Sequence, residues 1–506
     1  MNLNAEEHKP LRVAIVGTGI SGLSAGWLLA KEGVEVTLLE RLDSVGMDAH
    51  CVTVEKKDGS SFRLNTPPRS FSRTYYPNLI ELYRLSEVEI EPWSWSWVAF
   101  VVGSENPLLR MGRTDWFSGW SIPTYINLRQ PWETLKLWRD GYRFSTRCQR
   151  DLGDPKYANL TLEEYVRGIL NLSEAYIDKV LLPTLSMVCT CSYEACLAYP
   201  ADLVMQFYAR TSTAGQYRTR YGTEDAVRML TSNVSRVLTS VRVQCIEPGS
   251  NGLPVVKYTR DASNPQQDEP GAQTHVTEET FDHVILATQA NHGRYLINDE
   301  KLGRILESFS HEESQVVIHQ DPVVMPQRRE MWAPMSVGIA SPLVDEKAPS
   351  SMFTIWMNDT YPDLKHNLFQ TWNPVVDIDK TTVIDKAITF ERPIMRVETR
   401  QALKDLEGYQ GKNGIWFCGA WNAWRIPLQE SGVISALVVA KSIVGHTPVP
   451  EATWALPEDD IRHNEEARNS EKLTTIVRFG KSLFVLAAVG SLVMMLKPTT
   501  TRRAFI

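Results

Sequence analysis

The stretch VAIVGTGISG, residues 13–22, decides the fold of this chain. An apolar run, Leu11–Val16, leads into its three glycines, and Ser21–Glu32 has the pattern of a helix. Val34–Glu40 is a second apolar run, so a strand, a helix and a strand follow one another within about 30 residues. This order predicts a parallel βαβ unit of the Rossmann type, which binds a dinucleotide.

The residues of this unit have separate tasks. Gly17 allows the tight turn out of the first strand, Gly19 lets backbone N–H groups approach a pyrophosphate, and Gly22 lets the helix pack closely on the strand. Glu40 lies 18 residues after Gly22, where its carboxylate can accept hydrogen bonds from the adenosine ribose. Arg41 next to it is either a solvated surface charge or a contact for a 2′-phosphate, which Glu40 would repel. The unit alone does not separate NAD from FAD.

Composition narrows the class of protein. The 506 residues carry a net charge of −7, so nothing global indicates a nucleic-acid partner. Three of the seven cysteines, Cys189, Cys191 and Cys196, lie close together, but they lack the fourth ligand and the usual Cys-x2-Cys spacing of a zinc site. We therefore predict buried reduced thiols, no metal site and an intracellular, reducing compartment.

Two further segments favour FAD. ERLDSVGMDAH, residues 40–50, follows the acidic residue directly, and GIWFCGAW and ESGVISA begin at residues 414 and 430. With these stretches the chain resembles the flavin amine oxidase superfamily. It is most similar to a branch of predicted NAD/FAD-binding oxidoreductases of bacteria and fungi, and the resemblance runs from about Leu11 to Ile443.

The resemblance implies an α/β fold: a Rossmann-type, glutathione-reductase-like FAD domain built from discontinuous segments, with a mixed sheet and helix substrate domain. The expected FAD-binding segments are residues 11–90, 216–300 and 401–446, and the substrate domain takes the mainly helical 91–215 and the sheet 301–400. Residues 447–475 would be a linker. Within the substrate domain, residues 90–150 are rich in Trp and are expected to be irregular, and Thr161 to Glu164 forms a candidate capping box.

The resemblance also implies roles for single residues around non-covalent FAD. They fall into five groups along the cofactor. Gly17, Gly19, Ser21 and Gly22 would hold the pyrophosphate, and Gly46 would lie near the flavin phosphates. Glu40, with Arg41 beside it, would hold the adenosine ribose, and Val241 would hydrogen-bond the adenine through its backbone. Gly419, Ser431, Gly432 and Val433 would lie by the ribityl chain and the isoalloxazine. The helix that opens at Ser431 would stabilise negative charge on the reduced flavin.

Two departures separate the chain from its relatives. Met47 stands where the family usually has a second glycine, and the strand Gln315–His319 lacks the Lys that many amine oxidases place near flavin N5. His319 is then a candidate acid or base, with a structural, hydrogen-bonded histidine as the alternative. Trp421 and Arg425 are candidates for lining the substrate pocket, with core packing and a solvated arginine as the alternatives.

These observations predict an FAD-dependent oxidase, dehydrogenase or desaturase that acts on a small apolar or aromatic metabolite, such as one of secondary metabolism. The alternatives are a flavin-dependent double-bond isomerase acting on a lipid and a non-catalytic flavin-binding membrane protein. Oxygen and NAD(P) both remain open as electron acceptors. Ser482–Leu496 is apolar and uncharged, so residues 476–506 are a candidate membrane anchor that would leave the catalytic part in the cytosol.

Overall fold

A computed structural model describes residues 9–67, 69–93, 96–114, 120–125, 131–211, 215–260, 276–340 and 350–455. Met1–Trp454 forms one compact unit, and Ala455–Ile506 is separate from it. The candidate anchor and most of the predicted linker lie outside the described residues. Within the described ranges, no helix is both long enough and apolar enough to cross a membrane.

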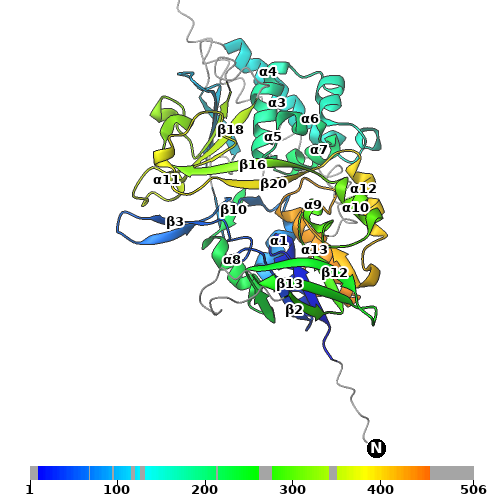
Figure 1. Cartoon of the computed structure of the whole chain (residues 1–506). Coiled ribbons are helices and arrows are strands. Elements are labelled where there is room, and N and C mark those ends of the chain that lie inside the picture. The colour runs from blue at the N-terminus through cyan, green and yellow to red at the C-terminus, as the bar shows by residue number, and fades with distance from the viewer. Residues whose placement is uncertain are drawn as a thin grey trace, which may run out of the picture. The chain divides into compact units, whose positions relative to one another are not determined.

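Five parallel strands form the sheet that carries the glycine loop, in the order β11-β2-β1-β15-β21 (Figure 1). Its members are β1 (Arg12–Val16), β2 (Glu35–Leu39), β11 (Arg236–Leu238), β15 (His283–Leu286) and β21 (Ile415–Phe417). The strands come from three parts of the chain that are distant in sequence. Their arrangement confirms the predicted Rossmann-like α/β fold.

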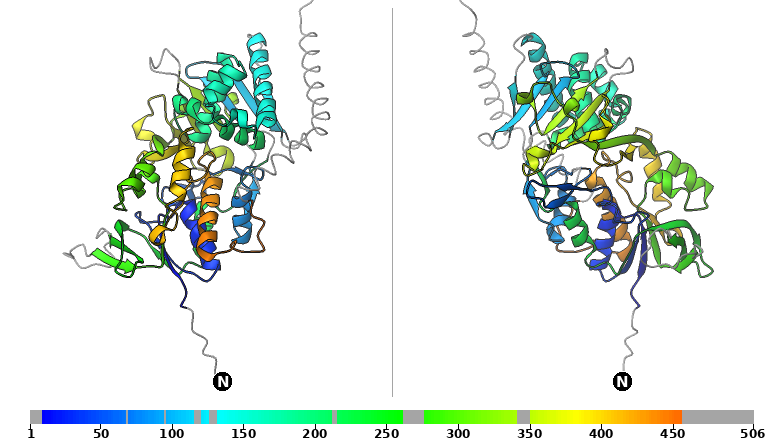
Figure 2. Two further views of the ribbon diagram at one scale, coloured as in Figure 1. Left: turned by 90° about the vertical axis from the view of Figure 1, so that its right-hand side faces the viewer. Right: turned by 60° about the vertical axis from the view of Figure 1, so that its left-hand side comes forward.

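Two helices pack against each other beside this sheet: α1 (Ile20–Lys31) and α13 (Gln429–Val444). Figure 2 shows them next to each other, in blue and orange. Both helices are buried along most of their length, as expected of helices that are apolar on nearly every side. Gly445, with a φ of +81°, ends α13 in the left-handed conformation that favours glycine.

Smaller elements surround this unit. The meander β12-β13-β14 is antiparallel, and so are the sheets β5-β10-β6 and β3-β4. The strands are β3 (Val52–Glu55), β4 (Ser61–Leu64), β5 (Phe71–Ser72), β6 (Ile90–Pro92), β10 (Gln216–Thr219), β12 (Val241–Pro248), β13 (Pro254–Arg260) and β14 (Val276–Thr280), and the helices are α2 (Pro77–Leu85), α8 (Gly222–Thr231), α9 (Ala290–Gly293), α10 (Glu300–Glu307) and α12 (Thr399–Glu407).

An eight-stranded mixed sheet has the order β20-β16-β19-β18-β17-β7-β8-β9. Its strands are β7 (Trp97–Val101), β8 (Leu109–Thr114), β9 (Trp120–Tyr125), β16 (Ser310–His319), β17 (Met335–Ile339), β18 (Ser351–Trp356), β19 (Phe369–Trp372) and β20 (Ile388–Ile394), and the short helix α11 is Met357–Thr360. The irregular structure predicted for residues 90–150 is wrong, because this stretch supplies three strands of the sheet and a long helix. Trp97 and Trp120 lie in β7 and β9, which agrees with the preference of aromatic residues for strands, whereas Trp132 and Trp138 lie in the helix.

That long helix, α3 (Pro131–Asp151), packs with α4 (Glu174–Tyr176), α5 (Leu182–Cys189), α6 (Tyr193–Ala198) and α7 (Ala201–Thr211). The predicted capping box is confirmed, since Thr161 N donates to Glu164 Oε2 and Glu164 N donates to Thr161 Oγ1. Cys189, Cys191 and Cys196 are free and buried in the core of these helices, as predicted for thiols.

Candidate dinucleotide site

The carboxyl ends of the parallel strands meet at one edge of the five-stranded sheet. Gly17 N donates to Leu39 O at 2.9 Å, Ala287 N to Val16 O at 2.9 Å, and Cys418 N to Leu286 O at 3.0 Å, so the loops after four strands leave the sheet together. β1 has β2 on one side and β15 on the other. Dinucleotides bind at such a point in sheets of this kind.

The glycine loop has the geometry predicted for it. Gly17 has a φ of +99°, and a Cβ on it would lie 2.9 Å from Ala287 O. A Cβ on Gly22 would lie 2.0 Å from Gly17 O, so the first turn of α1 approaches the loop as closely as a backbone can. A Cβ on Gly19 would meet no atom within 4 Å, which leaves open space at the position predicted for the pyrophosphate.

The N-terminus of α1 suits an anion. No side chain caps it at Gly19, and its first turn contains no acidic residue. The first N–H groups of a helix have no partner within the helix and carry partial positive charge. These residues therefore fit a dinucleotide phosphate.

Glu40 is 7% exposed, and the protein holds its carboxylate in place. Oε2 accepts hydrogen bonds from Thr18 N at 3.1 Å and from Thr18 Oγ1, and Oε1 accepts one from Leu42 N at 2.9 Å. Val241 N donates to Glu40 O at 2.8 Å, so this N–H is occupied, and the predicted adenine contact stays a prediction. Arg41 is exposed, which agrees with a solvated surface charge.

Thr18 is a residue of this site that the sequence analysis missed. Its hydroxyl donates to Glu40 and accepts a hydrogen bond from Gly46 N at 2.7 Å, so it joins the glycine loop to the next loop of the site. Met47, in place of the usual glycine, is 2% exposed, and its carbonyl accepts from Arg69 Nη1 at 3.1 Å. The sequence could have indicated this role of Thr18, because the residue lies between Gly17 and Gly19 of the glycine loop.

The first turn of α13 lies directly beside the glycine loop. A Cβ on Gly432 would lie 2.6 Å from Ser21 Oγ, so two segments predicted to hold the same cofactor do meet. Gly419 N donates to Ser435 Oγ at 3.0 Å, which ties the loop after β21 to α13. Ser431 Oγ donates to Ile426 O at 2.7 Å and thus holds the turn. Val433 is fully buried.

Trp421 packs in the core. It is 2% exposed, its Nε1 donates to Thr288 O at 2.9 Å, and its ring centroid lies 4.6 Å from that of Phe309. The alternative of core packing describes this geometry, and the structure does not support the pocket-lining role proposed for Trp421. The prediction relied on chain position between two cofactor loops, which does not determine where a side chain points.

Arg425 is buried rather than solvated. It is 4% exposed, its Nη2 donates to Tyr75 O at 3.1 Å, and its guanidinium lies 4.6 Å from the centroid of the Tyr75 ring. Nearby, the fully buried Glu430 accepts hydrogen bonds from Asn78 N, Asn78 Nδ2 and Leu79 N at 3.1, 2.8 and 2.9 Å. Glu430 thus satisfies the first N–H groups of α2 and fixes that helix against α13.

His319 is fully buried in the eight-stranded sheet. Its Nδ1 accepts from Asp321 N at 3.2 Å, so Nε2 carries the proton and donates to Thr371 Oγ1 at 2.8 Å. Burial lowers the pKa of His319 to about 4, which keeps the ring neutral at physiological pH. The alternative of a structural histidine describes this geometry, and the catalytic role stays a prediction without structural support.

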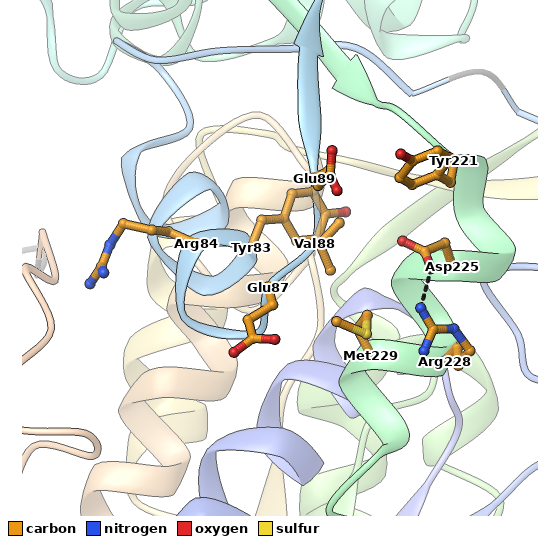
Figure 3. Close-up of a pocket in the computed structure, with 9 residues that line it drawn as sticks. All are labelled: Tyr83, Arg84, Glu87, Val88, Glu89, Tyr221, Asp225, Arg228 and Met229. Carbon is orange, nitrogen blue, oxygen red and sulfur yellow. Dashed lines mark hydrogen bonds and ion pairs between the residues drawn. The ribbon is translucent and has the colours of Figure 1, made fainter.

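A surface hollow of about 470 Å³ lies between the end of α2 and the start of α8 (Figure 3). None of the predicted site residues lines it. Its charged groups are partly paired within the protein: Arg228 Nη2 lies 2.6 Å from Asp225 Oδ1, as the dashed line in the figure marks. We assign it no part in the chemistry of the chain.

Comparisons with known proteins agree with this geometry. Residues 15–85 match the family model for an NAD(P)-binding Rossmann-like domain. A carotenoid phi-ring synthase of Streptomyces griseus is 42% identical over 72 residues, so the match covers only 14% of each of the two chains.

Solved structures extend the likeness to most of the chain. A CLA-producing fatty acid isomerase from P. acnes is 14% identical with a TM-score of 0.57, over 86% of this chain and 98% of that one. Cyclohexylamine oxidase from Brevibacterium oxydans is 12% identical with a TM-score of 0.53, over 86% and 99%. The chain therefore shares its fold with these two enzymes. At these identities the likeness establishes the fold alone.

Proposed function

We propose that the chain is an FAD-dependent oxidoreductase that holds its cofactor non-covalently. The observation that carries this proposal is the meeting of the α1 and α13 N-termini, with Gly432 against Ser21, at the carboxyl edge of the parallel sheet. A βαβ unit alone serves NAD as well as FAD. The second helix terminus adds a further anion-stabilising group beside the first, which suits the longer flavin dinucleotide.

The residues would divide the work along the cofactor. The N–H groups at Gly19 to Gly22 would bind the pyrophosphate, and Glu40 would orient the ribose from a position fixed by Thr18. The turn Ser431–Val433 would place the positive end of the α13 dipole at the pyrimidine end of the flavin. When bound, FAD would supply the hydride acceptor, and the protein would orient the substrate and exclude water.

The proposed activity is that of an oxidase, dehydrogenase or desaturase, and the proposed substrate is a small apolar or aromatic metabolite. Double-bond isomerisation is the second candidate, because the similar structure from P. acnes is that of a fatty acid isomerase. β16, the strand that ends at His319, contains no Lys, so the proposal does not include the lysine of the amine oxidases.

The test is to purify the full chain and record its absorption. We expect flavin bands near about 370 and 450 nm, and release of the flavin on denaturation. Anaerobic bleaching of the flavin by a metabolite would establish oxidation, and a product of unchanged mass would establish isomerisation. Colourless protein that does not take up added FAD contradicts the proposal.

We also propose that residues 476–506 associate the chain with a membrane, on the ground of the apolar stretch Ser482–Leu496. Deletion of Ser482–Ile506 should then move the protein from the membrane fraction to the soluble fraction of cells. Full-length protein that is already found in the soluble fraction contradicts this proposal.

A further inference from the structure

Arg392 lies on β20 and faces the helical part of the protein. Phe390, Arg392 and Ile394 alternate along this strand, so their side chains share one face of it. Ile394 is 2% exposed and belongs to the core formed by the helices α3 to α7. The guanidinium of Arg392 therefore points into the region between the sheet and these helices.

The guanidinium of Arg392 has no partner in the described part of the chain. Many protein atoms surround the side chain, which is half-buried and keeps some accessible surface. Its Nε is covered by protein and makes no hydrogen bond. A covered N–H of a charged group that lacks a hydrogen-bonding partner costs stability, and a ligand that accepts a hydrogen bond from it would remove this cost.

The two nearest carboxylates along the strands do not serve Arg392. Glu391 lies on the other face of β20, where its Oε2 is 2.7 Å from His292 Nε2. Glu312 is opposite Arg392 on β16, but its carboxylate accepts from Ser192 N at 2.9 Å and from Ser192 Oγ at 3.0 Å. Both acidic groups are thus held elsewhere.

The acidic side chains that interact electrostatically with Arg392 are weak acids in their neutral form. They are the phenol of Tyr199 and the thiols of Cys189 and Cys191. Burial raises the pKa of Tyr199 well above its ordinary value, and a hydrogen bond with Cys191 together with burial does the same for the pKa of Cys189. None of these groups supplies the negative charge that the guanidinium lacks.

A second half-buried cation, Arg69, interacts electrostatically with Arg392. Burial lowers the pKa of Arg69, and the charge of Arg392 acts in the same direction, so the two guanidinium groups repel each other. Arg69 also donates to the carbonyl of Met47, next to Gly46 in the loop predicted to lie near the flavin phosphates. An anion at Arg392 would relieve this repulsion and would lie on the side of the proposed flavin site.

We propose that Arg392 binds the carboxylate of an anionic substrate whose apolar body packs beside Phe390. A guanidinium matches a carboxylate through two parallel hydrogen bonds, which a neutral substrate could not accept equally well. This inference rests on the proposed function for the chemistry of the substrate. The anion site itself depends only on the geometry of Arg392.

The test uses benzoate as the carboxylate probe and benzamide as its neutral counterpart. Their binding to the full chain is measured by calorimetry and, separately, by the change in the flavin spectrum. Benzoate should bind wild type, and Arg392→Met should raise its Kd by roughly 30-fold or more, since a buried charge pair loses one member. Arg392→Lys keeps the positive charge but not the pair of parallel N–H donors, so its Kd for benzoate should lie between those of wild type and Arg392→Met. Benzamide should bind weakly to every variant.

Arg304→Met is the matched control, because Arg304 is an exposed residue of α10 that pairs with Glu300. It should bind benzoate as wild type does. Equal benzoate affinity in wild type and Arg392→Met would overturn the proposal, and so would benzamide that binds as tightly as benzoate. Inorganic phosphate that binds more tightly than benzoate would overturn the choice of a carboxylate.

A measurement of bound FAD distinguishes a failure of this inference from a failure of the proposed function. Arg392→Met should retain FAD in the amount found in wild type. Loss of FAD with unchanged benzoate binding would assign the guanidinium to the cofactor and overturn the proposal. Benzoate binding that depends on Arg392 in a protein without FAD would leave the anion site standing and contradict the proposed function.

Discussion

Gly432 lies so close to Ser21 that a methyl group on Gly432 would come within 2.6 Å of Ser21 Oγ and 2.9 Å of Ile20 Cγ2. Gly432→Ala should therefore push α13 away from α1, lower the free energy of unfolding by about 1–3 kcal/mol and reduce the bound flavin. Gly303→Ala is the control, because a Cβ on this helical glycine would meet no atom within 4 Å. It should raise stability by roughly 0.5–1 kcal/mol. Thermal unfolding and flavin content measure both effects, and an unaltered Gly432→Ala protein would contradict the close packing.

Glu40 should matter for stability as well as for the cofactor. Glu40→Ala removes the acceptor for Thr18 and for Leu42 N, so unfolding of the cofactor-free protein should become easier by roughly 1–3 kcal/mol. FAD affinity should fall too, because the ribose contacts are lost. Glu40→Gln keeps an acceptor of similar shape and should lie between wild type and Ala. Titration with FAD and urea unfolding separate the two effects; unchanged FAD affinity in Glu40→Ala would remove its ribose role.

His319 should make the protein less stable in acid. Its pKa in the folded state is about 4, below the ordinary 6.5, so below pH 6.5 the unfolded chain takes up a proton that the folded one does not. The folded state thus loses roughly 3 kcal/mol as the pH falls from 6.5 to 4. His319→Asn should lose less stability over this range than wild type, as urea unfolding at several pH values would measure. Flavin reduction by the substrate should persist in this variant, and its loss would restore a catalytic role.

Removal of the Glu430 side chain should lower the free energy of unfolding strongly. Glu430→Ala deletes the acceptor of three hydrogen bonds at the start of α2 and the carboxyl group that interacts with Arg425. We expect a loss of roughly 3–5 kcal/mol in the free energy of unfolding. Glu300→Ala, on the exposed face of α10, should leave stability within about 0.5 kcal/mol of wild type. A similar loss in both variants would show that the effect does not come from the α2 contact.

The sequence predicted the cofactor half of the molecule well because its signals are local. Gly17 and Gly22 are required by the local backbone geometry, and the order of strand, helix and strand within about 30 residues then predicted the parallel unit. The meeting of Gly432 with the glycine loop came instead from resemblance, since no local rule joins residues so far apart in sequence.

The predictions for chemistry were weaker because they needed side-chain directions. Trp421 and His319 were chosen by their position in the chain, and both turned out to be satisfied inside the core. Arg392 was overlooked, although a lone arginine between Phe390 and Ile394 on one strand face is itself a signal. Its meaning depends on which acidic groups lie nearby, and only the packed structure shows that Glu391 and Glu312 are held elsewhere.

The central sheet has a consequence for how the protein is made. β1 leaves the ribosome long before β21 and α13, which complete its neighbourhood. Contacts of such long sequence separation form slowly, because the intervening loop must close first. Under the proposed function, FAD would stabilise the newly made chain fully only after Gln429–Val444 has emerged, and added flavin should improve the yield of folded protein only from that point of synthesis onward.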